Sequence, residues 1–364
     1  MAGFPITPSA VDAAWLEGCL RGAGAMDAGR ITDIAWEVIG TGQVGETARF
    51  HLTYDRAGAG PATVAAKFPS ADPTSRSTAA LFSLYAKEVG FYRAVAGMLD
   101  VRVPRVYAAE IAENKADFVL LFEDLGPARV GNQLDGCSLA DARAAMCQAA
   151  ALHAPTRGNA AVLGADWLKA ADGVAARICA GYHHAHAIFR ERYDGQLPEE
   201  LMVICDQLEA RIEGWVGRNL PDPCLVHGDF RLDNMMFDIG GGAEPIAVVD
   251  WQTVAVGCAM SDIGYFMGCG IGGVLRRAHE HELLDLYAAE MTRRGVPETR
   301  ASLWNRYRIG ALHGAFTAVF SAAFVVRTPR GDANFLSMAR GACELALDHD
   351  SVGALDHYLE TGKC

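Results

Sequence analysis

The sequence predicts an α+β protein with two lobes, a β-rich lobe followed by a mainly helical one. Three observations support this prediction. The chain has 364 residues, which is more than one hydrophobic core usually supports. Strand-like runs are concentrated before residue 125, whereas helical periodicity dominates after it. Hydrophobic residues make up 51% of the chain, which excludes a largely disordered protein.

The first lobe is expected to contain a short helix, a five-stranded sheet and one longer helix. Residues 9–22 have the amphipathic pattern of a helix, with Ser9 as the expected N-cap. Residues 75–98 are rich in Ala and Leu and predict a single helix. Five apolar runs bounded by turn signals predict strands. These runs are residues 31–39, 47–54, 62–68, 105–111 and 117–122.

The second lobe is expected to be mainly helical, and its boundary lies near Gly126, Pro127 and Gly131. Short strand-like runs interrupt the helical pattern at residues 224–252. Helices are predicted at residues 139–153, 167–193, 199–216, 274–295, 301–326 and 334–346. The chain is therefore divided into an N-terminal helical extension (1–30), an N-lobe (31–125) and a C-lobe (126–364).

Composition narrows the class of protein. Lys and Arg total 32 against 44 for Asp and Glu, so the formal net charge is −12. An acidic chain with no Lys/Arg cluster is a poor match for nucleic acid or an anionic membrane, and we expect neither as a partner. Residues 309–326 contain no Asp, Glu, Lys or Arg, but the run is short for a membrane span. We expect it to form a buried core helix.

The cysteines and the start of the chain indicate the compartment. The ten cysteines include no C-x-x-C pair, which excludes the common zinc and thioredoxin-like spacings. Their apolar surroundings are typical of buried free thiols in a reducing compartment. The first residues lack the basic and apolar segments of a signal peptide. We therefore expect a cytoplasmic enzyme.

The most informative stretch is residues 225–237. An apolar run delivers His227 and Asp229 into a loop, and Asn234 follows Asp229 by five residues as the apolar pattern resumes. A glycine-rich turn then returns the chain through an apolar strand to Asp250. Amide and carboxylate oxygens suit Mg²⁺, and a carboxylate can accept a proton from an attacking hydroxyl. The alternative interpretation is a tight turn with acidic surface residues.

The pattern His-Gly-Asp-x-x-x-x-Asn, followed by a strand ending in Asp, resembles the aminoglycoside phosphotransferase branch of the protein-kinase-like superfamily. The Asp-Trp-Gln and Asn-Met-Met-Phe sequences are similar to its ecdysteroid-kinase-like (CHK kinase-like) group. This resemblance implies a two-lobed protein-kinase-like fold, with a five-stranded antiparallel N-lobe and a mainly helical C-lobe. It implies that Asp229 is the catalytic base, that Asn234 and Asp250 are Mg²⁺ ligands, and that His227 braces the loop.

The resemblance also implies a nucleotide site in the N-lobe. Gly40, Gly42 and Gly45 form G-x-G-x-x-G between two predicted strands, where backbone amides could cover phosphates; a glycine-rich hairpin is the alternative. Lys67 ends the third strand, and Glu88 lies on the following helix. The family's Lys–Glu ion pair, which positions the α- and β-phosphates, corresponds to these two residues. The alternative is a surface lysine and a solvated glutamate.

Two further segments correspond to parts of the family's fold. The strand ending at Glu123 resembles the hinge, so the backbone around Glu123 and Leu125 is expected to bind adenine. Asp262 matches an Asp whose role is structural, holding the catalytic loop through backbone hydrogen bonds.

Two clusters of polar residues could suggest other sites. His183, His184 and His186 lie close together, but they share no single helix face and no Cys or carboxylate completes the set. We favour a solvated or substrate-facing helix over a metal site. The acidic run at residues 280–285 could attract a cationic substrate, although a solvated helix face is favoured.

The sequence therefore predicts a small-molecule kinase that transfers the ATP γ-phosphoryl group to a hydroxyl, with ATP and Mg²⁺ as cofactors. Gly228 replaces the Arg that receives the activation-loop phosphate in protein kinases, and no Ala-Pro-Glu element follows Asp250. Both features point away from protein substrates. The alternative is a catalytically inactive, kinase-like nucleotide-binding module. The acceptor, the preference for ATP over GTP and the oligomeric state are left open.

Overall fold

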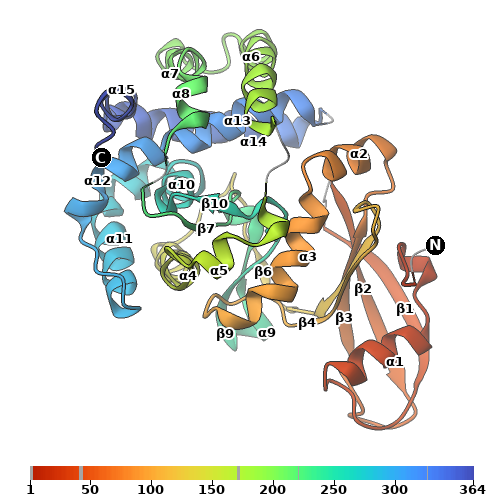
Figure 1. The fold of residues 1–364 in the computed structure, drawn as a ribbon. Helices are drawn as coiled ribbons and strands as arrows, with labels where there is room; N and C mark the ends of the chain where they lie inside the picture. The colour runs from red at the N-terminus through yellow and green to blue at the C-terminus, as the bar shows by residue number, and fades with distance from the viewer. Residues whose placement is uncertain (1–2, 41–43, 170–172, 220, 326) are drawn as a thin grey trace. The chain divides into compact units, whose positions relative to one another are not determined.

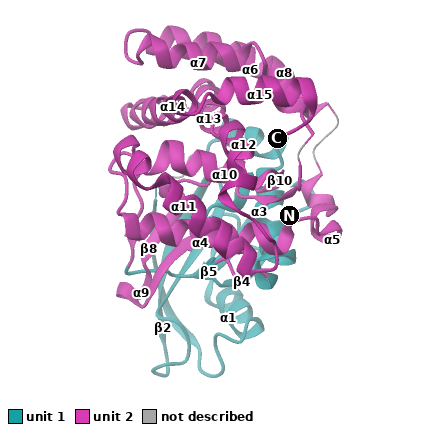
Figure 2. Cartoon of the chain, turned by 90° about the vertical axis from the view of Figure 1, so that its left-hand side faces the viewer, with its two compact units in different colours: residues 1–98, 102–127, 249–253 teal, residues 99–101, 128–248, 254–364 magenta. Residues whose placement is uncertain are grey.

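The computed structural model describes residues 3–40, 44–169, 173–219, 221–325 and 327–364. The chain forms two compact units, coloured separately in Figure 2. Unit 1 comprises residues 1–98, 102–127 and 249–253, and unit 2 comprises residues 99–101, 128–248 and 254–364. Both units are discontinuous in sequence. The short segment that carries Asp250 belongs to unit 1, although the residues on either side of it belong to unit 2.

Unit 1 is built on a five-stranded antiparallel sheet, as predicted (Figure 1). Its strands are β1 (Ile31–Ile39), β2 (Gly45–Tyr54), β3 (Thr63–Pro69), β4 (Val106–Ile111) and β5 (Phe118–Glu123). They lie in the order β1-β2-β3-β5-β4. Lys67 pairs with Thr47 of β2 on one side and with Leu120 of β5 on the other, so it lies on the central strand.

Side chains alternate between the two faces of this sheet, and a helix covers each face. The helices of unit 1 are α1 (Ala13–Gly22), α2 (Pro73–Leu81) and α3 (Leu84–Ala94). Phe68 lies in the core shared with α1. On the other face, Tyr85 of α3 packs on Phe118 of β5 with ring centroids 4.4 Å apart. Because Lys67 immediately precedes Phe68, its side chain points to the face covered by α3.

Two helix predictions in unit 1 are wrong in detail. Ser9 is not the N-cap of α1, because it lies in a separate 3₁₀ turn (Pro8–Ala10) that precedes the helix. Asp12 caps α1 instead, and its side chain accepts a hydrogen bond from the Trp15 amide. The single helix predicted for residues 75–98 is broken between α2 and α3. The break is at Ser83, which has a φ of 56°, and a 3₁₀ turn (Ala96–Met98) follows α3.

Unit 2 is mainly helical. Its longer helices are α4 (Leu139–Thr156), α6 (Val174–Tyr193), α7 (Glu199–Glu209), α11 (Gly273–Arg293), α12 (Arg300–Gly310), α13 (Leu312–Phe324), α14 (Pro329–Asp348) and α15 (Ser351–Thr361). The shorter ones are α5 (Ala160–Leu163), α8 (Ile212–Gly217), α9 (Ile239–Gly242) and α10 (Ala259–Tyr265). A large hydrophobic core joins α6, α7, α13 and α14. The sequence pattern did not indicate α10 or α15.

The charge-free run at residues 309–326 is divided between α12 and α13 rather than forming one helix. Leu312, Ala315, Val319 and other apolar residues of this run lie in the core, as predicted, whereas Phe324 is exposed. None of the helices in the described part of the chain has the length and apolar character needed to cross a membrane.

Short strands position the predicted catalytic loop. β6 (Arg129–Val130), β8 (Met235–Asp238) and β9 (Glu244–Val248) form one sheet, and β7 (Cys224–Val226) pairs with β10 (Ala255–Gly257). The loop between β7 and β8 therefore starts and ends in paired strands. Met235 pairs with Val248, so Asn234 precedes β8 at the end of the hairpin from which the chain continues to Asp250.

Candidate active site

In unit 1, the predicted lysine lies between two carboxylates. Lys67 Nζ donates to Glu88 Oε2 and Oε1 at 2.8 and 3.0 Å, and to Asp250 Oδ1 at 2.8 Å. The side chains of Lys67 and Glu88 are only 12% and 2% exposed, so neither residue lies on the surface. Burial would lower the pKa of Lys67, but the charges of Asp250 and Glu88 raise it above its ordinary value. The amine is therefore charged at neutral pH.

Ring stacking fixes Asp250 beside this pair. Trp251 follows Asp250 and stacks on Phe91 of α3, with ring centroids 3.9 Å apart and planes at 7°. Phe91 lies three residues after Glu88, so both side chains lie on the same side of α3. Asp250 itself has a φ of 64°, a left-handed conformation that is uncommon outside glycine and occurs often at functional sites.

The glycine-rich segment borders the lysine at one end. Gly40 has a φ of 76° and bends the chain after β1. A Cβ atom at Gly45 would lie 3.2 Å from Lys67 Cε and 3.0 Å from the carbonyl oxygen of Phe68, so glycine lets the backbone approach Lys67 closely. Gly42 lies outside the described residues. The two ends of the predicted phosphate loop are thus placed, and its binding role stays a prediction.

The predicted hinge residue Glu123 is tied into unit 1. Its Oε1 atom accepts hydrogen bonds from Arg102 at 2.5 Å and from the Arg105 amide at 2.7 Å. The Glu123 amide donates to the Arg105 carbonyl at 2.9 Å. Leu125 is buried. The Glu123 amide is therefore already used, and adenine binding by Glu123 and Leu125 stays a prediction.

In unit 2, three side chains hold the carboxylate of Asp229. The Tyr265 hydroxyl donates to Oδ1 at 2.8 Å, Asn234 Nδ2 donates to Oδ2 at 2.8 Å, and Arg231 Nε pairs with Oδ1 at 3.0 Å. Asp229 keeps 22% of its side chain exposed. Burial alone would raise the pKa of Asp229, but the charge of Arg231 and the surrounding hydrogen-bond donors lower it. Asp229 is therefore ionised at neutral pH and fixed in position.

Asp262 holds the backbone of this loop, the structural role that the family resemblance implies. Its Oδ2 atom accepts a hydrogen bond from the His227 amide at 2.6 Å, and its Oδ1 atom accepts one from the Gly228 amide at 2.9 Å. Gly228 has a φ of 81°, a left-handed backbone conformation that favours glycine at this position of the loop. The Asp229 amide donates to His227 Nδ1 at 3.3 Å, and His227 thereby braces the loop.

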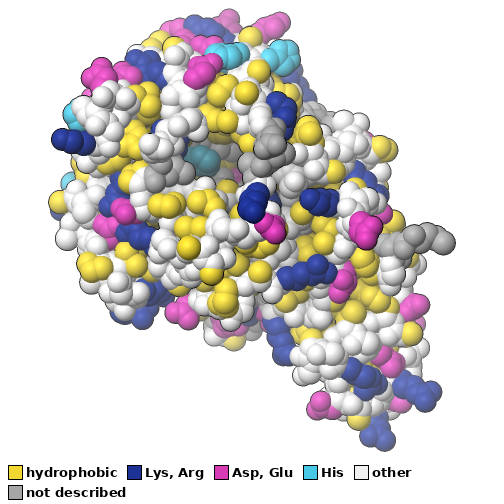
Figure 3. Space-filling view, viewed as in Figure 1, with side chains coloured by type: hydrophobic (Ala, Val, Ile, Leu, Met, Phe, Trp, Pro, Cys, Tyr) yellow, Lys and Arg dark blue, Asp and Glu magenta, His cyan; other side chains and the backbone are white. Residues whose placement is uncertain are grey.

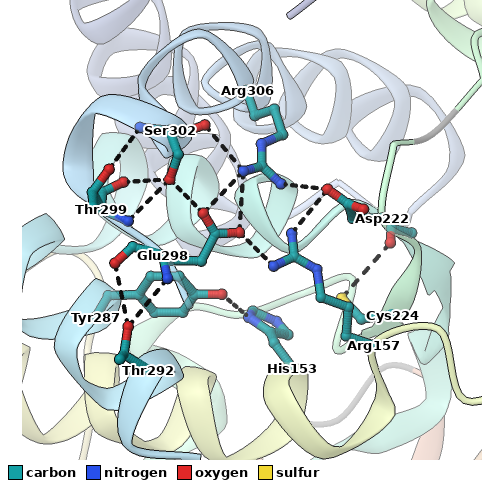
Figure 4. A network of polar contacts seen from close by, with 11 residues as sticks. His153, Arg157, Asp222, Cys224, Tyr287, Thr292, Glu298, Thr299, Ser302 and Arg306 are labelled. Carbon is teal, nitrogen blue, oxygen red and sulfur yellow. Dashed lines mark hydrogen bonds and ion pairs between the residues drawn. The ribbon is translucent and has the colours of Figure 1, made fainter. Parts of the chain in front are cut away.

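A polar network among the helices of unit 2 is shown in Figure 4, and His153 joins it to Asp262. His153 of α4 places Nε2 3.2 Å from Asp262 Oδ2 and Nδ1 3.0 Å from the Tyr287 hydroxyl. Arg157, which directly follows α4, pairs with Glu298, and Glu298 also pairs with Arg306 of α12. The loop is thus anchored, through Asp262, to three helices of unit 2.

The donors expected for Mg²⁺ are chemically suitable. Asn234 makes both of its contacts with Asp229 through Nδ2, so its carbonyl oxygen Oδ1 remains as a donor for a metal ion. Asp250 supplies a carboxylate, and oxygens of both types suit Mg²⁺. Within the residues that the structure describes, no group of three or more His, Cys, Asp or Glu side chains is arranged to hold a metal. A Mg²⁺ ion bound through few protein groups and phosphates needs no such group.

Three residues that contact the loop were not predicted from the sequence: Arg231, Tyr265 and His313. Arg231 could have been found, because it lies two residues after Asp229. Tyr265 and His313 could not, because they come from α10 and α13. His313 Nε2 donates to the Gly228 carbonyl at 3.0 Å across 85 residues of sequence, and no pattern marks that contact.

The histidine cluster is paired with carboxylates on neighbouring helices. His183 places Nδ1 2.6 Å from Glu209 and Nε2 3.0 Å from Glu213, and these carboxylates raise the pKa of His183. His186 Nε2 lies 2.9 Å from Asp206. Figure 3 shows histidine and acidic side chains together over α6 and α7. The local sequence around the histidines does not contain these carboxylates, because they lie on α7 and α8.

The acidic run on α11 is only partly a solvated face. Glu280 is buried, where it accepts a hydrogen bond from the Tyr307 hydroxyl at 2.5 Å and lies 2.7 Å from His349. The expectation of solvation is therefore wrong for Glu280. The exposed Asp285 pairs with Arg300 at 2.6 Å, so its charge is already compensated.

The five-stranded unit with its buried Lys–Glu pair and the helical unit with its Asp-centred loop define a protein-kinase-like fold. The model of the phosphotransferase enzyme family matches residues 46–302. The chain belongs to this family.

Solved structures and curated proteins give further similarities. A putative aminoglycoside phosphotransferase from Ralstonia eutropha JMP134 is similar over 92% of this chain and 97% of its own, with a TM-score of 0.53 and 19% identity. A spectinomycin phosphotransferase, solved with ADP and spectinomycin, is similar over 94% of this chain and 99% of its own, with a TM-score of 0.50 and 11% identity. At these identities the similarity shows the fold alone.

Among curated proteins, acyl-CoA dehydrogenase family member 11 of Rattus norvegicus is 44% identical over 64 residues, or 16% of this chain. The human protein of the same name is 40% identical over 60 residues, or 15% of this chain. Each match spans 8% of the length of the curated relative.

Proposed function

We propose that this phosphotransferase transfers the γ-phosphoryl group of ATP to a hydroxyl of a small molecule, with Asp229 as the catalytic base. The observation that carries the proposal is the buried contact of Lys67 with Glu88 and Asp250 in unit 1. A charged lysine buried between carboxylates from a helix and a distant segment suits binding of nucleotide phosphates. The spectinomycin phosphotransferase was solved in complex with ADP, which supports a nucleotide as donor.

In unit 1, Lys67 would contact the α- and β-phosphates while Glu88 holds its amine in place. Backbone amides near Gly40, Gly42 and Gly45 would cover the phosphates, and backbone groups near Glu123 and Leu125 would bind adenine. Lys67 is suited to this role because its charge is secured by its partners before nucleotide binds. Glu88 would remain paired throughout, because it is almost fully buried.

In unit 2, Asp229 would orient the acceptor hydroxyl. The acceptor oxygen forms a bond to the γ-phosphorus, the bond from that phosphorus to the β–γ bridging oxygen breaks, and the hydroxyl proton passes to Asp229. The lowered pKa of Asp229 makes it a weak base, so orientation of the hydroxyl is its larger contribution. Asn234 and Asp250 would hold Mg²⁺, which neutralises phosphate charge when it is bound.

Two finer assignments belong to the same proposal. The Asp250-Trp251-Gln252 sequence, with the ring of Trp251 stacked on α3, supports placement in the ecdysteroid-kinase-like (CHK kinase-like) group. The free cysteines are in keeping with a cytoplasmic location, because reduced thiols are usual there. A non-catalytic nucleotide-binding module is a poorer account, because such a module has no need for an ionised Asp229 with three partners.

The test uses the full chain and a panel of alcohols comprising sterols, aminoglycosides, choline, sugars and phenylalkanols. Incubation with Mg²⁺ and γ-labelled ATP should give a phosphorylated alcohol with at least one panel member. Mg²⁺·ATP should also raise the melting temperature, since at 100 times Kd a native-state ligand adds about 2.7 kcal/mol of stability. Removing Mg²⁺ with EDTA should abolish most of that shift. Absence of both transfer and Mg²⁺-dependent stabilisation would contradict the proposal.

A further inference from the structure

One face of α13 carries four aromatic side chains, His313, Phe316, Phe320 and Phe324, which we call the aromatic stripe. They lie three or four residues apart, so they follow one side of the helix. His313, Phe316 and Phe320 are half-buried, and Phe324 is 50% exposed. Residues 309–325 include no Asp, Glu, Lys or Arg. The stripe is thus a partly open aromatic face without charge.

The stripe begins at the catalytic loop. His313 Nε2 donates to the Gly228 carbonyl at 3.0 Å, and the ring of His313 lies edge-on to Tyr265 with centroids 5.4 Å apart. The Tyr265 hydroxyl in turn contacts Asp229 at 2.8 Å. From His313 to Phe316 and then to Phe320, successive ring centroids are 6.3 and 5.7 Å apart, with planes at 22° and 16°. The aromatic face is therefore continuous with the groups that hold Asp229.

Helix α6 packs against the rings of Phe316 and Phe320. Tyr182 is fully buried and stacks on Phe316, with centroids 5.1 Å apart and planes at 3°. A Cβ atom at Gly181 would lie 3.4 Å from the ring of Phe320, so the helix backbone lies close against that ring. Rings held by a stack and a close helix lose little freedom when a ligand binds. The stripe is therefore a preorganised surface.

We infer that the aromatic stripe is the acceptor subsite, and that it takes a neutral alcohol with an elongated apolar body. This inference rests on the proposed function, because it places the reacting hydroxyl at Asp229. Uncharged rings beside the reacting group favour an apolar body, whereas a polycationic acceptor would need carboxylates, and α13 offers none. Burial lowers the pKa of His313, so its ring is neutral at pH 7 and adds no charge to the subsite.

The spacing along α13 makes the subsite sensitive to acceptor length. At 1.5 Å per residue, Phe316, Phe320 and Phe324 lie roughly 4.5, 10.5 and 16.5 Å from His313 along the helix axis. An acceptor as short as 2-phenylethanol would reach Phe316 alone. An acceptor the length of 8-phenyloctan-1-ol would reach Phe320 with its terminal ring.

The experiment measures binding and transfer for 2-phenylethanol, 4-phenylbutan-1-ol and 8-phenyloctan-1-ol with the full chain. Titration calorimetry in the presence of Mg²⁺ and a non-hydrolysable ATP analogue gives Kd without any need for turnover. Phe320→Ala should weaken 8-phenyloctan-1-ol about tenfold and 2-phenylethanol less than twofold. The control Leu347→Ala removes an exposed apolar side chain from α14, outside the stripe, and should change neither value. Affinity for the ATP analogue should be unchanged in both variants.

Several results would overturn the inference and leave the proposed function standing. One is transfer to kanamycin or choline with no binding of any phenylalkanol. A second is equal weakening of the short and the long alcohol by Phe320→Ala. A third is a change of oligomeric state on sedimentation for Phe324→Ala with alcohol Kd unchanged, which would make the stripe a contact with a second copy. Absence of Mg²⁺·ATP binding together with absence of transfer to every alcohol would instead contradict the proposed function.

Discussion

Both units pair a cation with functional carboxylates, but they assemble the pair in different ways. In unit 1, Lys67 contacts Glu88 and Asp250, which lie 21 and 183 residues away. In unit 2, Arg231 contacts Asp229 from only two residues away. The first cluster exists because a sheet, a helix and a stacked Trp–Phe pair bring distant segments together. The second cluster forms within one loop, and Tyr265, which is distant in sequence, donates a further hydrogen bond to Asp229.

This difference indicates where each cluster is vulnerable. In the lysine cluster, the side chains of Lys67 and Glu88 are only 12% and 2% exposed, so losing either one leaves a buried charge without its partner. The charged pair in unit 2 is more exposed, with 22% of the Asp229 side chain and 21% of the Arg231 side chain accessible, so losing one member leaves no fully buried charge. Changes in unit 1 should therefore affect stability strongly, whereas changes at Asp229 should affect turnover with little effect on folding.

The largest expected effect is on turnover in Asp229→Asn. The substitution keeps the shape of the side chain but removes its charge and basicity, so kcat should fall by roughly 10²–10⁴. ATP affinity should stay within about twofold, because the expected phosphate and metal contacts involve Lys67, Asn234 and Asp250. The measurement combines calorimetric ATP affinity with the rate of transfer to a true acceptor. Near-native turnover in this variant would show that Asp229 is not the base.

The second prediction tests the buried pair in unit 1. Lys67→Met should lower the free energy of unfolding by about 3–5 kcal/mol, because it leaves the buried Glu88 carboxylate uncompensated. The double variant Lys67→Met/Glu88→Gln should recover most of that loss while remaining unable to bind ATP normally. Urea denaturation of both variants gives the two values. If the double variant is as unstable as the single one, the loss reflects packing rather than unpaired charge.

The third prediction concerns Asp262, which holds the loop backbone. Asp262→Asn should lower the free energy of unfolding by about 2–3 kcal/mol at pH 7, because a carboxylate that accepts charge-assisted hydrogen bonds is lost. Burial would raise the pKa of Asp262, but His153 and the loop amides lower it below its ordinary value. Because the pKa of Asp262 is lower in the folded than in the unfolded protein, its carboxylate stabilises the fold. This contribution is complete above the unfolded pKa of about 3.9, and it is lost as the pH falls through the folded-state pKa.

The gap in stability between wild type and Asp262→Asn should therefore be constant from pH 7 to about pH 5 and should narrow below pH 4. Urea denaturation at pH 7, 5, 4 and 3 measures this gap. A gap that does not change with pH would show that Asp262 contributes by shape alone. In contrast with the lysine cluster, this carboxylate acts on the geometry of the loop.

The sequence predicted the parts of both clusters that follow from motif spacing or strand alternation. All five strands of unit 1 were predicted to within two residues, because turn signals bound them. The pairing of Lys67 with Glu88 was predicted through the family resemblance. The left-handed conformation of Asp250 and its inclusion in unit 1 were not predictable, because they depend on the stacking of Trp251 on Phe91.

Contacts between helices that are distant in the sequence could not be predicted either. Tyr265 lies on α10, a seven-residue helix that was too short to show clear periodicity. Nothing in the pattern indicates that its hydroxyl reaches Asp229. The same holds for the break at Ser83, where Ala-rich sequence on both sides predicts a continuous helix. Tertiary packing decided these features against local propensity.

The smallest expected effect, and the one that best separates the two clusters, is that of Tyr265→Phe. The substitution removes one neutral hydrogen-bond donor to Asp229 and keeps the ring that contacts His313. Losing one such bond is worth about 1 kcal/mol, so kcat should fall roughly fivefold to tenfold with ATP affinity unchanged. Tyr193→Phe is the matched control, because the Tyr193 hydroxyl donates to the carboxylate of Asp332 at the same 2.8 Å. It should leave kcat unchanged, since Asp332 lies in the first turn of α14 and pairs with Tyr193 and Arg327.

A double-mutant cycle shows whether Tyr265 acts through Asp229. In the Asp229→Asn background, Tyr265→Phe should cause no further loss of kcat, because the carboxylate that it positions is already gone. Additive losses would mean that Tyr265 affects turnover by another route, such as the packing of α10 against α13. Unit 1 offers no comparable variant, because every contact within its lysine cluster is between charged groups. Non-additivity in unit 2 would show that the Tyr265 hydroxyl acts on turnover through the Asp229 carboxylate. The stability rescue predicted for Lys67→Met/Glu88→Gln would show that the charge pair of unit 1 acts on folding.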